Sequence, residues 1–106
     1  MVTLEEFKKL ELKVAEIKDV LDHPNADKLY VITIDLGDKI KQVVAGIKPS
    51  YKKEELIGKQ VVVVDNLAAA VLRGVESQGM LLAASDETGI AILSPQRKVK
   101  LGSIVK

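Results

Sequence analysis

The sequence holds few side chains that could do covalent or acid–base chemistry. It has no cysteine and a single histidine, His23, which excludes thiol nucleophiles, disulfides and a zinc site built from histidines within one chain. His23 precedes Pro24 in a segment dense in turn formers, where a structural or solvated histidine is the usual case. The glycines form neither a Walker A loop nor a GxGxxG motif. We therefore expect no catalytic residue, no metal site and no cofactor.

The side chains that could bind a partner are cations. Sixteen Lys and Arg against fifteen Asp and Glu leave a net charge of +1, so a polyanion would have to be held by a local cluster of charges. One Phe, two Tyr and no Trp are too few to stack several unpaired bases. The composition therefore favours recognition of a folded RNA through its shape, phosphates and 2′-hydroxyls. The candidate cations are Lys39 and Lys41 on a predicted hairpin, Lys48 before a predicted helix, Lys59 after it, and Arg73 in a long connection. For any one of these lysines, a purely solubilising role is the alternative.

The connection between Asp65 and Met80 is the most unusual stretch. It begins with an apolar run over 67–72 that shows no strand alternation, and it ends with polar residues just before another apolar strand. Long ordered loops are where binding residues collect, so Asn66, Ser77, Gln78 and Met80 are candidate binding residues. The structural alternatives stay open: Asn66 as a cap of the loop backbone, Ser77 as the start of a strand and Met80 as part of the core.

The periodicity of apolar residues predicts an all-β protein. Thr3 and Glu6 fit a capping box, which predicts a short helix over 3–10. The expected strands are 12–17, 30–36, 40–47, 60–64 and 79–84, with a small helix over 50–57 between the third and fourth. Within 12–17 the apolar phase changes, which indicates a bulge or a strong bend. Five short strands with a helix after the third form the layout of an OB-fold barrel.

With 106 residues, the chain is expected to form one domain, residues 1–106. Residues 1–10 would be the N-terminal helix, 11–85 the barrel and 86–106 a C-terminal extension. The extension carries more apolar residues than a small barrel can cover, so we expect a two-fold dimer interface there. A hairpin folded over the barrel of the same chain is the alternative. The residues expected in the dimer interface are Ile90, Ile92, Leu93, Val99, Leu101 and Ile104.

The N-terminal residues lack the basic start and apolar stretch of a signal peptide. No apolar run is long enough to cross a bilayer. We therefore expect a cytoplasmic protein with no membrane partner.

Taken together and in order, several short motifs resemble one protein family, the tRNA-binding domain appended to the C-terminus of methionyl-tRNA synthetases. The same domain occurs in free-standing dimeric tRNA-binding proteins and in the endothelial-monocyte-activating polypeptide. The motifs span nearly all of the chain after residue 10; they are Leu12–Ile17, His23–Tyr30, Val43–Ile47, Asn66–Leu67, Leu72–Gly74 and Ser77–Ala84.

The resemblance implies an OB-fold with a C-terminal extension, homodimerisation, and non-catalytic binding of folded tRNA beside the catalytic part of a methionyl-tRNA synthetase. It also implies that Asn66, Arg73, Ser77 and Met80 lie at or beside the tRNA-facing surface. The chain departs from the family at 68–70, where three alanines replace the usual Lys-Pro and a further basic residue. This departure shifts the expected binding charge toward Arg73 and the hairpin lysines. Two other functions stay open: an export chaperone of the related peptide-binding branch, which is also a dimer, and a module that only dimerises.

Overall fold

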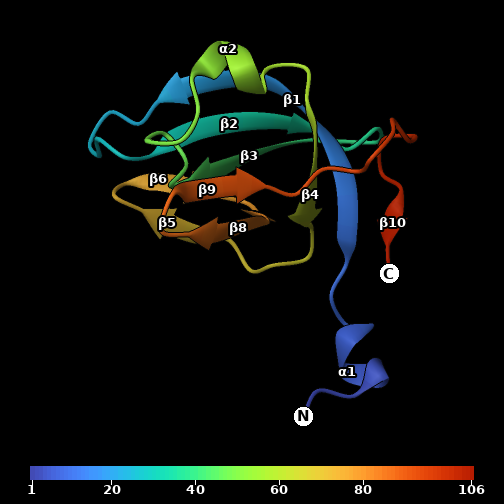
Figure 1. Ribbon diagram of the computed structural model, residues 1–106. Coiled ribbons are helices and arrows are strands. Elements are labelled where there is room, and N and C mark those ends of the chain that lie inside the picture. Colours follow the sequence, from blue (N-terminus) through green and yellow to red (C-terminus); the bar gives the residue numbers. More distant parts are fainter.

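The computed structural model describes all residues from 1 to 106 and consists mainly of antiparallel strands (Figure 1). The main sheet runs in the order β3-β2-β1-β4-β7. Its β3 edge meets the segment before β7, where the Gln78 N–H donates to the Gln42 carbonyl at 2.8 Å. The sheet therefore curls into a nearly closed barrel, which confirms the expected OB-like fold. The five strands are β1 (Leu12–Asp22), β2 (Tyr30–Asp35), β3 (Ile40–Ala45), β4 (Gln60–Val64) and β7 (Met80–Leu81).

β1 is the strand on which the barrel bends. Its first half pairs with β4 and its second half with β2. The register with β2 shifts between Ile17 and Asp19, close to the point where one partner strand gives way to the other. A bulge lets a single strand turn from one side of a barrel to the next. The bulge lies just beyond the predicted stretch 12–17. Within that stretch the apolar phase changes because Leu12 packs in an outer cluster, whereas Ala15 and Ile17 lie in the core.

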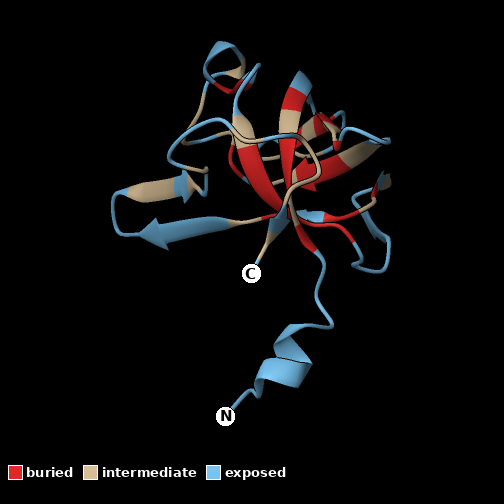
Figure 2. Cartoon of the chain, turned by 90° about the vertical axis from the view of Figure 1, so that its right-hand side faces the viewer, coloured by how far each residue is buried: buried red, intermediate tan, exposed pale blue.

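The core lies inside this barrel, where the buried residues gather (Figure 2). Alternation in β2 buries Tyr30, Ile32 and Ile34, and on β4 Val61 and Val63 face the same interior. Each fully buried aliphatic side chain contributes about 1.5–3 kcal/mol relative to exposure. The barrel is therefore a firm base for the loops and hairpins at its ends.

Both helices are single turns, shorter than the predicted 3–10 and 50–57: α1 is Leu4–Phe7 and α2 is Lys53–Leu56. The expected capping box of Thr3 and Glu6 is present. Residues 1–10 are nevertheless all exposed, and α1 projects away from the barrel (Figures 1 and 2). A short helix without tertiary contacts does not extend. In α2, by contrast, Leu56 is fully buried and fixes the turn against the barrel.

The connection over 65–78 is more regular than the sequence predicts, because it contains a hairpin of β5 (Ala70–Leu72) and β6 (Val75–Ser77). All three residues of β5 are exposed, so burial imposes no alternation that a sequence pattern could reveal. The turn consists of Arg73 and Gly74, whose φ angles are 54° and 90°. Two successive positive φ values give the twist that tight hairpins require.

The C-terminal extension folds partly onto its own barrel. β8 (Ala83–Asp86) and β9 (Gly89–Ile92) form a second hairpin, and β10 (Ile104–Val105) pairs with the start of β1. Ile90 and Ile92 pack against the main core. The expected strand over 79–84 is split between β7 and β8, because the two belong to different sheets. No helix has the length and apolar character needed to cross a membrane.

Candidate nucleic-acid interface

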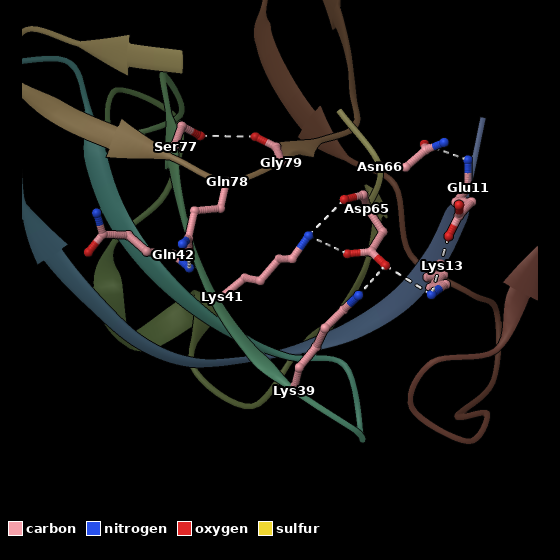
Figure 3. Close-up of polar contacts among 10 residues, drawn as sticks. All are labelled: Glu11, Lys13, Lys39, Lys41, Gln42, Asp65, Asn66, Ser77, Gln78 and Gly79. Carbon is pink, nitrogen blue, oxygen red and sulfur yellow. Dashed lines mark hydrogen bonds and ion pairs between the residues drawn. The ribbon is translucent and has the colours of Figure 1, made fainter. Parts of the chain in front are cut away.

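A buried carboxylate gathers three lysines at one end of the barrel (Figure 3). Asp65 directly follows β4, and its side chain is only 2% exposed. Its carboxylate oxygens lie 2.9 Å from Lys13 Nζ, 2.8 Å from Lys39 Nζ and 2.7 Å from Lys41 Nζ. Lys41 also donates to the Asp65 carbonyl oxygen at 2.7 Å. These ion pairs join the end of β4 to the start of β1 and to the β2–β3 hairpin.

The three lysines of this cluster share one carboxylate, which balances only one of their three positive charges. Burial by itself raises the pKa of Asp65, but hydrogen bonds from Lys39, Lys41 and Lys13 outweigh that effect and hold its pKa far below the usual range. The hydrogen bond to Asp65 likewise raises the pKa of Lys13. Lys39 and Lys41, the two hairpin lysines predicted to contact RNA, thus converge on one face, and both are paired with Asp65.

Asn66 and Ser77 turn toward the protein backbone. The Asn66 side chain accepts from the Glu11 N–H at 2.8 Å and donates to the Lys9 carbonyl at 2.7 Å, which ties the N-terminal segment to the end of β4. The buried Ser77 hydroxyl accepts from the Val44 N–H and donates to the Gly79 carbonyl, both at 2.9 Å. Asn66 thus caps backbone groups, as the structural alternative predicts.

Gln78 has a similar arrangement on the same side of the barrel. Its side-chain oxygen accepts from the Gln42 N–H at 2.9 Å, and the Gln42 side chain donates to the Glu76 carbonyl at 2.8 Å. Gln42 is the neighbour of Lys41 on β3, so this paired backbone contact lies beside the lysine cluster (Figure 3). Gln78 closes the barrel, and only part of its side chain reaches solvent.

Arg73 is exposed at the tip of the β5–β6 hairpin, and the single histidine holds that hairpin in place. His23 Nε2 donates to the Leu72 carbonyl at 2.9 Å, while its Nδ1 accepts from the Asn25 N–H at 2.9 Å. The Asn25 side chain donates to the Arg73 carbonyl at 3.3 Å. His23 is buried and has a structural role, and the His-Pro-Asn motif presents the arginine.

Met80 is 45% exposed and lies on the rim of an apolar groove of about 330 Å³. Eight of the ten residues that line this groove are hydrophobic. They come from the end of β3, from the segment that includes β7 and from the β8–β9 hairpin, and no lysine is among them. The lining residues are Val44–Ile47, Met80–Ala83, Ser85 and Ile90.

The remaining predicted cations lie elsewhere. Lys48 pairs with Asp22 at 3.0 Å, and Lys53 pairs with the same carboxylate at 3.2 Å, at the far end of β1 from Lys13. These lysines lower the pKa of Asp22. Lys59 is exposed at the start of β4, at the opposite end of that strand from Asp65.

Lys59 is accompanied by two cations that the sequence analysis missed. Together with Arg97 and Lys98 it lines a hollow of about 310 Å³ that contains no acidic residue. The sequence signal was two adjacent basic residues after Ser94-Pro95. Nothing in the local pattern indicates that they fold back beside residue 59. No group of three His, Cys, Asp or Glu side chains that could hold a metal ion occurs in the structure.

Comparison with known proteins shows the family of the chain. Residues 12–104 match the family model described as "Putative tRNA binding domain". The methionine–tRNA ligases of Thermococcus kodakarensis and Pyrococcus furiosus are each 55% identical to this chain over 105 residues, which is 99% of the chain. The chain spans only 14% of the length of these curated relatives.

Two solved structures superpose on the whole chain. A methionyl-tRNA-synthetase-related protein from Pyrococcus horikoshii is 33% identical, with a TM-score of 0.92 over 100% of this chain and 98% of that one. The CsaA chaperone protein of Picrophilus torridus is 31% identical, with a TM-score of 0.93 over 100% of both chains. Because the family model covers residues 12–104 and relatives match at 55% identity, the chain belongs to the tRNA-binding domain family that includes the C-terminal domain of methionyl-tRNA synthetases.

Proposed function

We propose that the chain is a non-catalytic tRNA-binding module, the C-terminal domain or the beta subunit of a methionyl-tRNA synthetase. It would act in the cytoplasm as a homodimer, with residues 1–106 as a single unit, and hold folded tRNA near the catalytic part of the enzyme. The observation that carries the proposal is the family match over 12–104, together with relatives that are methionine–tRNA ligases.

The aromatic residues favour contacts with the RNA backbone over base stacking. Tyr30 is buried and its hydroxyl donates to the Tyr51 carbonyl at 2.7 Å, while the Tyr51 hydroxyl accepts from the Ile92 N–H at 3.0 Å. Phe7 lies on α1, away from the barrel. No stacking platform of several aromatic side chains is available, so shape, phosphates and 2′-hydroxyls remain as the features to be read.

The predicted binding residues divide into three groups in this proposal. Arg73, Met80 and Lys59 are exposed and would touch tRNA directly. Asn66, Ser77 and Gln78 would act through the backbone that they hold. Lys39, Lys41 and Lys48 would contribute only where a phosphate competes successfully with their carboxylate partners.

The homodimer is supported by apolar residues on the outer face of the barrel. On β4, Val62 and Val64 face away from the main core and form a second cluster with Leu12. Val105 packs against this cluster, and Leu93, whose carbonyl accepts from the Val62 N–H, is 43% exposed beside it. Ile104 pairs with Lys13 and therefore faces the other side of the sheet, where it is 72% exposed. We propose Leu93 as the centre of the interface and Ile104 as a contact on the exposed strand β10. Of the other residues expected there, Val99 and Leu101 are half-buried, and Ile90 and Ile92 contribute mainly to their own core.

A titration against three ligands tests the proposed function. Folded tRNA, duplex RNA and an unfolded polypeptide are each added to the protein, and retention on filters is measured at several salt concentrations. We expect tRNA to bind most tightly, with a log–log salt slope of roughly −3 per chain for three or four phosphate contacts. Preference for the polypeptide, or tRNA binding that is indifferent to salt, would contradict the proposal.

A peptide-binding chaperone is the second candidate, and two observations favour it. The apolar groove beside Met80 has room for hydrophobic side chains, and a CsaA chaperone superposes on the full chain. The polypeptide arm of the titration decides between the two functions. A chain that binds none of the three ligands would match the remaining alternative, a module that only dimerises.

A further inference from the structure

The hollow beside Lys59 differs from the lysine clusters around Asp65 and Asp22 because its cations form no ion pairs. Neither Lys59, Arg97 nor Lys98 forms an ion pair with a carboxylate. All three are exposed, and none of the eight residues lining the hollow is acidic. The lysines around Asp65 and Asp22, by contrast, already have anionic partners.

The wall of the hollow is fastened to the barrel by Gln60. The Gln60 side chain donates to the Val99 carbonyl at 2.7 Å and accepts from the Val99 N–H at 3.1 Å. The Ser94 hydroxyl donates to the Gln60 carbonyl at 2.6 Å. The segment that carries Arg97 and Lys98 is therefore tied down at both ends. Its two charges are presented by a fixed loop, which lowers the entropic cost of binding.

The backbone under Lys59 is equally well held. The Ile17 N–H donates to the Lys59 carbonyl at 2.9 Å, and the Lys59 N–H donates to the Leu56 carbonyl at 3.0 Å. The carboxylate on the strand opposite Gln60 belongs to Glu16, and it is paired with Lys18 at 2.9 Å. Glu16 is thus already engaged by a cation of its own strand.

We propose that Lys59, Arg97 and Lys98 form a phosphate-contact site for the backbone of bound tRNA. This inference rests on the proposed function and names the surface that it uses. An RNA backbone fits better than an acidic protein because no hydrophobic residue lines the hollow. Protein interfaces are built around apolar and aromatic cores, whereas nucleic-acid interfaces are polar and cationic. The basic charge missing at 68–70 is thus supplied at the other end of β4.

The double variant Arg97→Ala/Lys98→Ala tests the site against the matched control Lys28→Ala/Lys52→Ala. The control removes the same charge from exposed lysines that pair with no carboxylate. We expect the Arg97→Ala/Lys98→Ala variant to bind tRNA about ten- to a hundredfold more weakly at 0.1 M salt, with a salt slope reduced by about 2. The control should change neither quantity by more than about twofold.

The outcomes separate this inference from the proposed function. If the wild-type chain does not bind tRNA, the proposed function fails. If it binds and both double variants lose affinity equally, only net charge matters and the site is overturned. If the Arg97→Ala/Lys98→Ala variant binds tRNA as tightly as the wild-type chain, the site is overturned as well. Melting curves of the three proteins show whether a loss comes from unfolding.

Protection from acetylation gives a second measurement on the unmodified chain. Saturating tRNA should slow the acetylation of Lys59 and Lys98 at least about fivefold and leave Lys28 and Lys52 unchanged. Equal rates at all four lysines with and without tRNA would overturn the site. Protection of Lys39 and Lys41 alone would do the same, because it would place the phosphates at Asp65.

Discussion

The carboxylate of Asp65 limits how far three nearby lysines are available to bind phosphate. Asp65 pairs with Lys13, Lys39 and Lys41 at distances of 2.7–2.9 Å. Each of the three lysines therefore has an anionic partner in the absence of RNA, although one carboxylate balances only one of the three positive charges. The sequence indicates where the lysines are, but not their partner. The hydrogen-bonded pairs join residues 24 and 52 positions apart, a separation that no local pattern covers.

The substitution Asp65→Asn should free these lysines and strengthen tRNA binding. Removing the carboxylate leaves three ammonium groups for phosphates, so the salt slope should steepen by about 2 and the affinity should rise about tenfold at 0.1 M salt. The measurement is a salt-series titration. The control Asp86→Asn removes the same charge at an exposed residue whose side chain forms no ion pair and is hydrogen-bonded to Thr88. A result identical to the control would show that the cluster lies away from the RNA.

Asp65 should also make the unfolding free energy of the protein decrease at low pH. The pKa of Asp65 is lowered in the folded state, so its stabilising effect is present above the unfolded pKa of about 3.9 and is lost as pH falls below it. The unfolding free energy of the wild-type chain, measured in urea between pH 5 and pH 2, should decrease more steeply than that of Asp65→Asn. Parallel curves for the two proteins would contradict the assignment.

At the scale of elements, Ser77 joins three pieces of backbone. Its hydroxyl links β3 to the turn before β7, so Ser77→Ala leaves the Val44 N–H buried without a partner. We expect the unfolding free energy to fall by about 1–3 kcal/mol, while the folded variant keeps its tRNA affinity within about twofold. Ser85→Ala, at an exposed position, is the control for stability. Lost affinity with unchanged stability would instead mean that Ser77 touches RNA directly.

The C-terminal extension depends on a glycine at a close backbone approach. Gly102 has a φ of 85°, and an added Cβ would lie 2.6 Å from the Leu36 carbonyl oxygen. Gly58 has a similar φ of 89° with nothing within 4 Å of an added Cβ. Gly58→Ala therefore measures the cost of the backbone conformation, about 1 kcal/mol. Gly102→Ala should cost at least about 2 kcal/mol more in urea unfolding, because the backbone must shift. Equal costs would show that the extension adapts freely.

At the scale of the whole molecule, a net charge of +1 hides an uneven distribution. Two groups of lysines surround Asp65 and Asp22, and a third group of cations lines a hollow without an acid. A weak site on each chain gains from being presented twice, because the second contact becomes intramolecular. The dimer is for this reason part of the proposed function.

The variant Ile104→Asp should break the dimer. A charge on this exposed apolar residue of β10 would cost far more in an interface than on a free surface, so light scattering should give the mass of one chain instead of two. The affinity for tRNA should fall at least about tenfold through lost avidity. Leu21→Asp, at a residue 55% exposed on the second half of β1, should leave the dimer intact. A wild-type chain that is already monomeric would contradict the interface.

The sequence by itself determined the barrel. The alternation in β2 and the four valines of β4 are local consequences of burial, so these two strands were predicted within about two residues. β1 was predicted as 12–17 but continues to Asp22. The family resemblance also came from linear motifs, and the match over 12–104 confirms it. Exposed elements escaped prediction or were predicted too long: the β5–β6 hairpin has a strand with no buried side, and α1 has no buried residue.

Only the tertiary structure decided which charges are free. Whether a lysine faces a carboxylate or an open hollow depends on residues brought together from different strands, as Lys13 and Lys41 are at Asp65, and as Arg97 and Lys98 are at Lys59. Apolar periodicity follows from the repeat of a single strand, whereas charge pairing acts through space between segments distant in the chain. The fold could therefore be predicted from the sequence, whereas the distribution of binding charge could not.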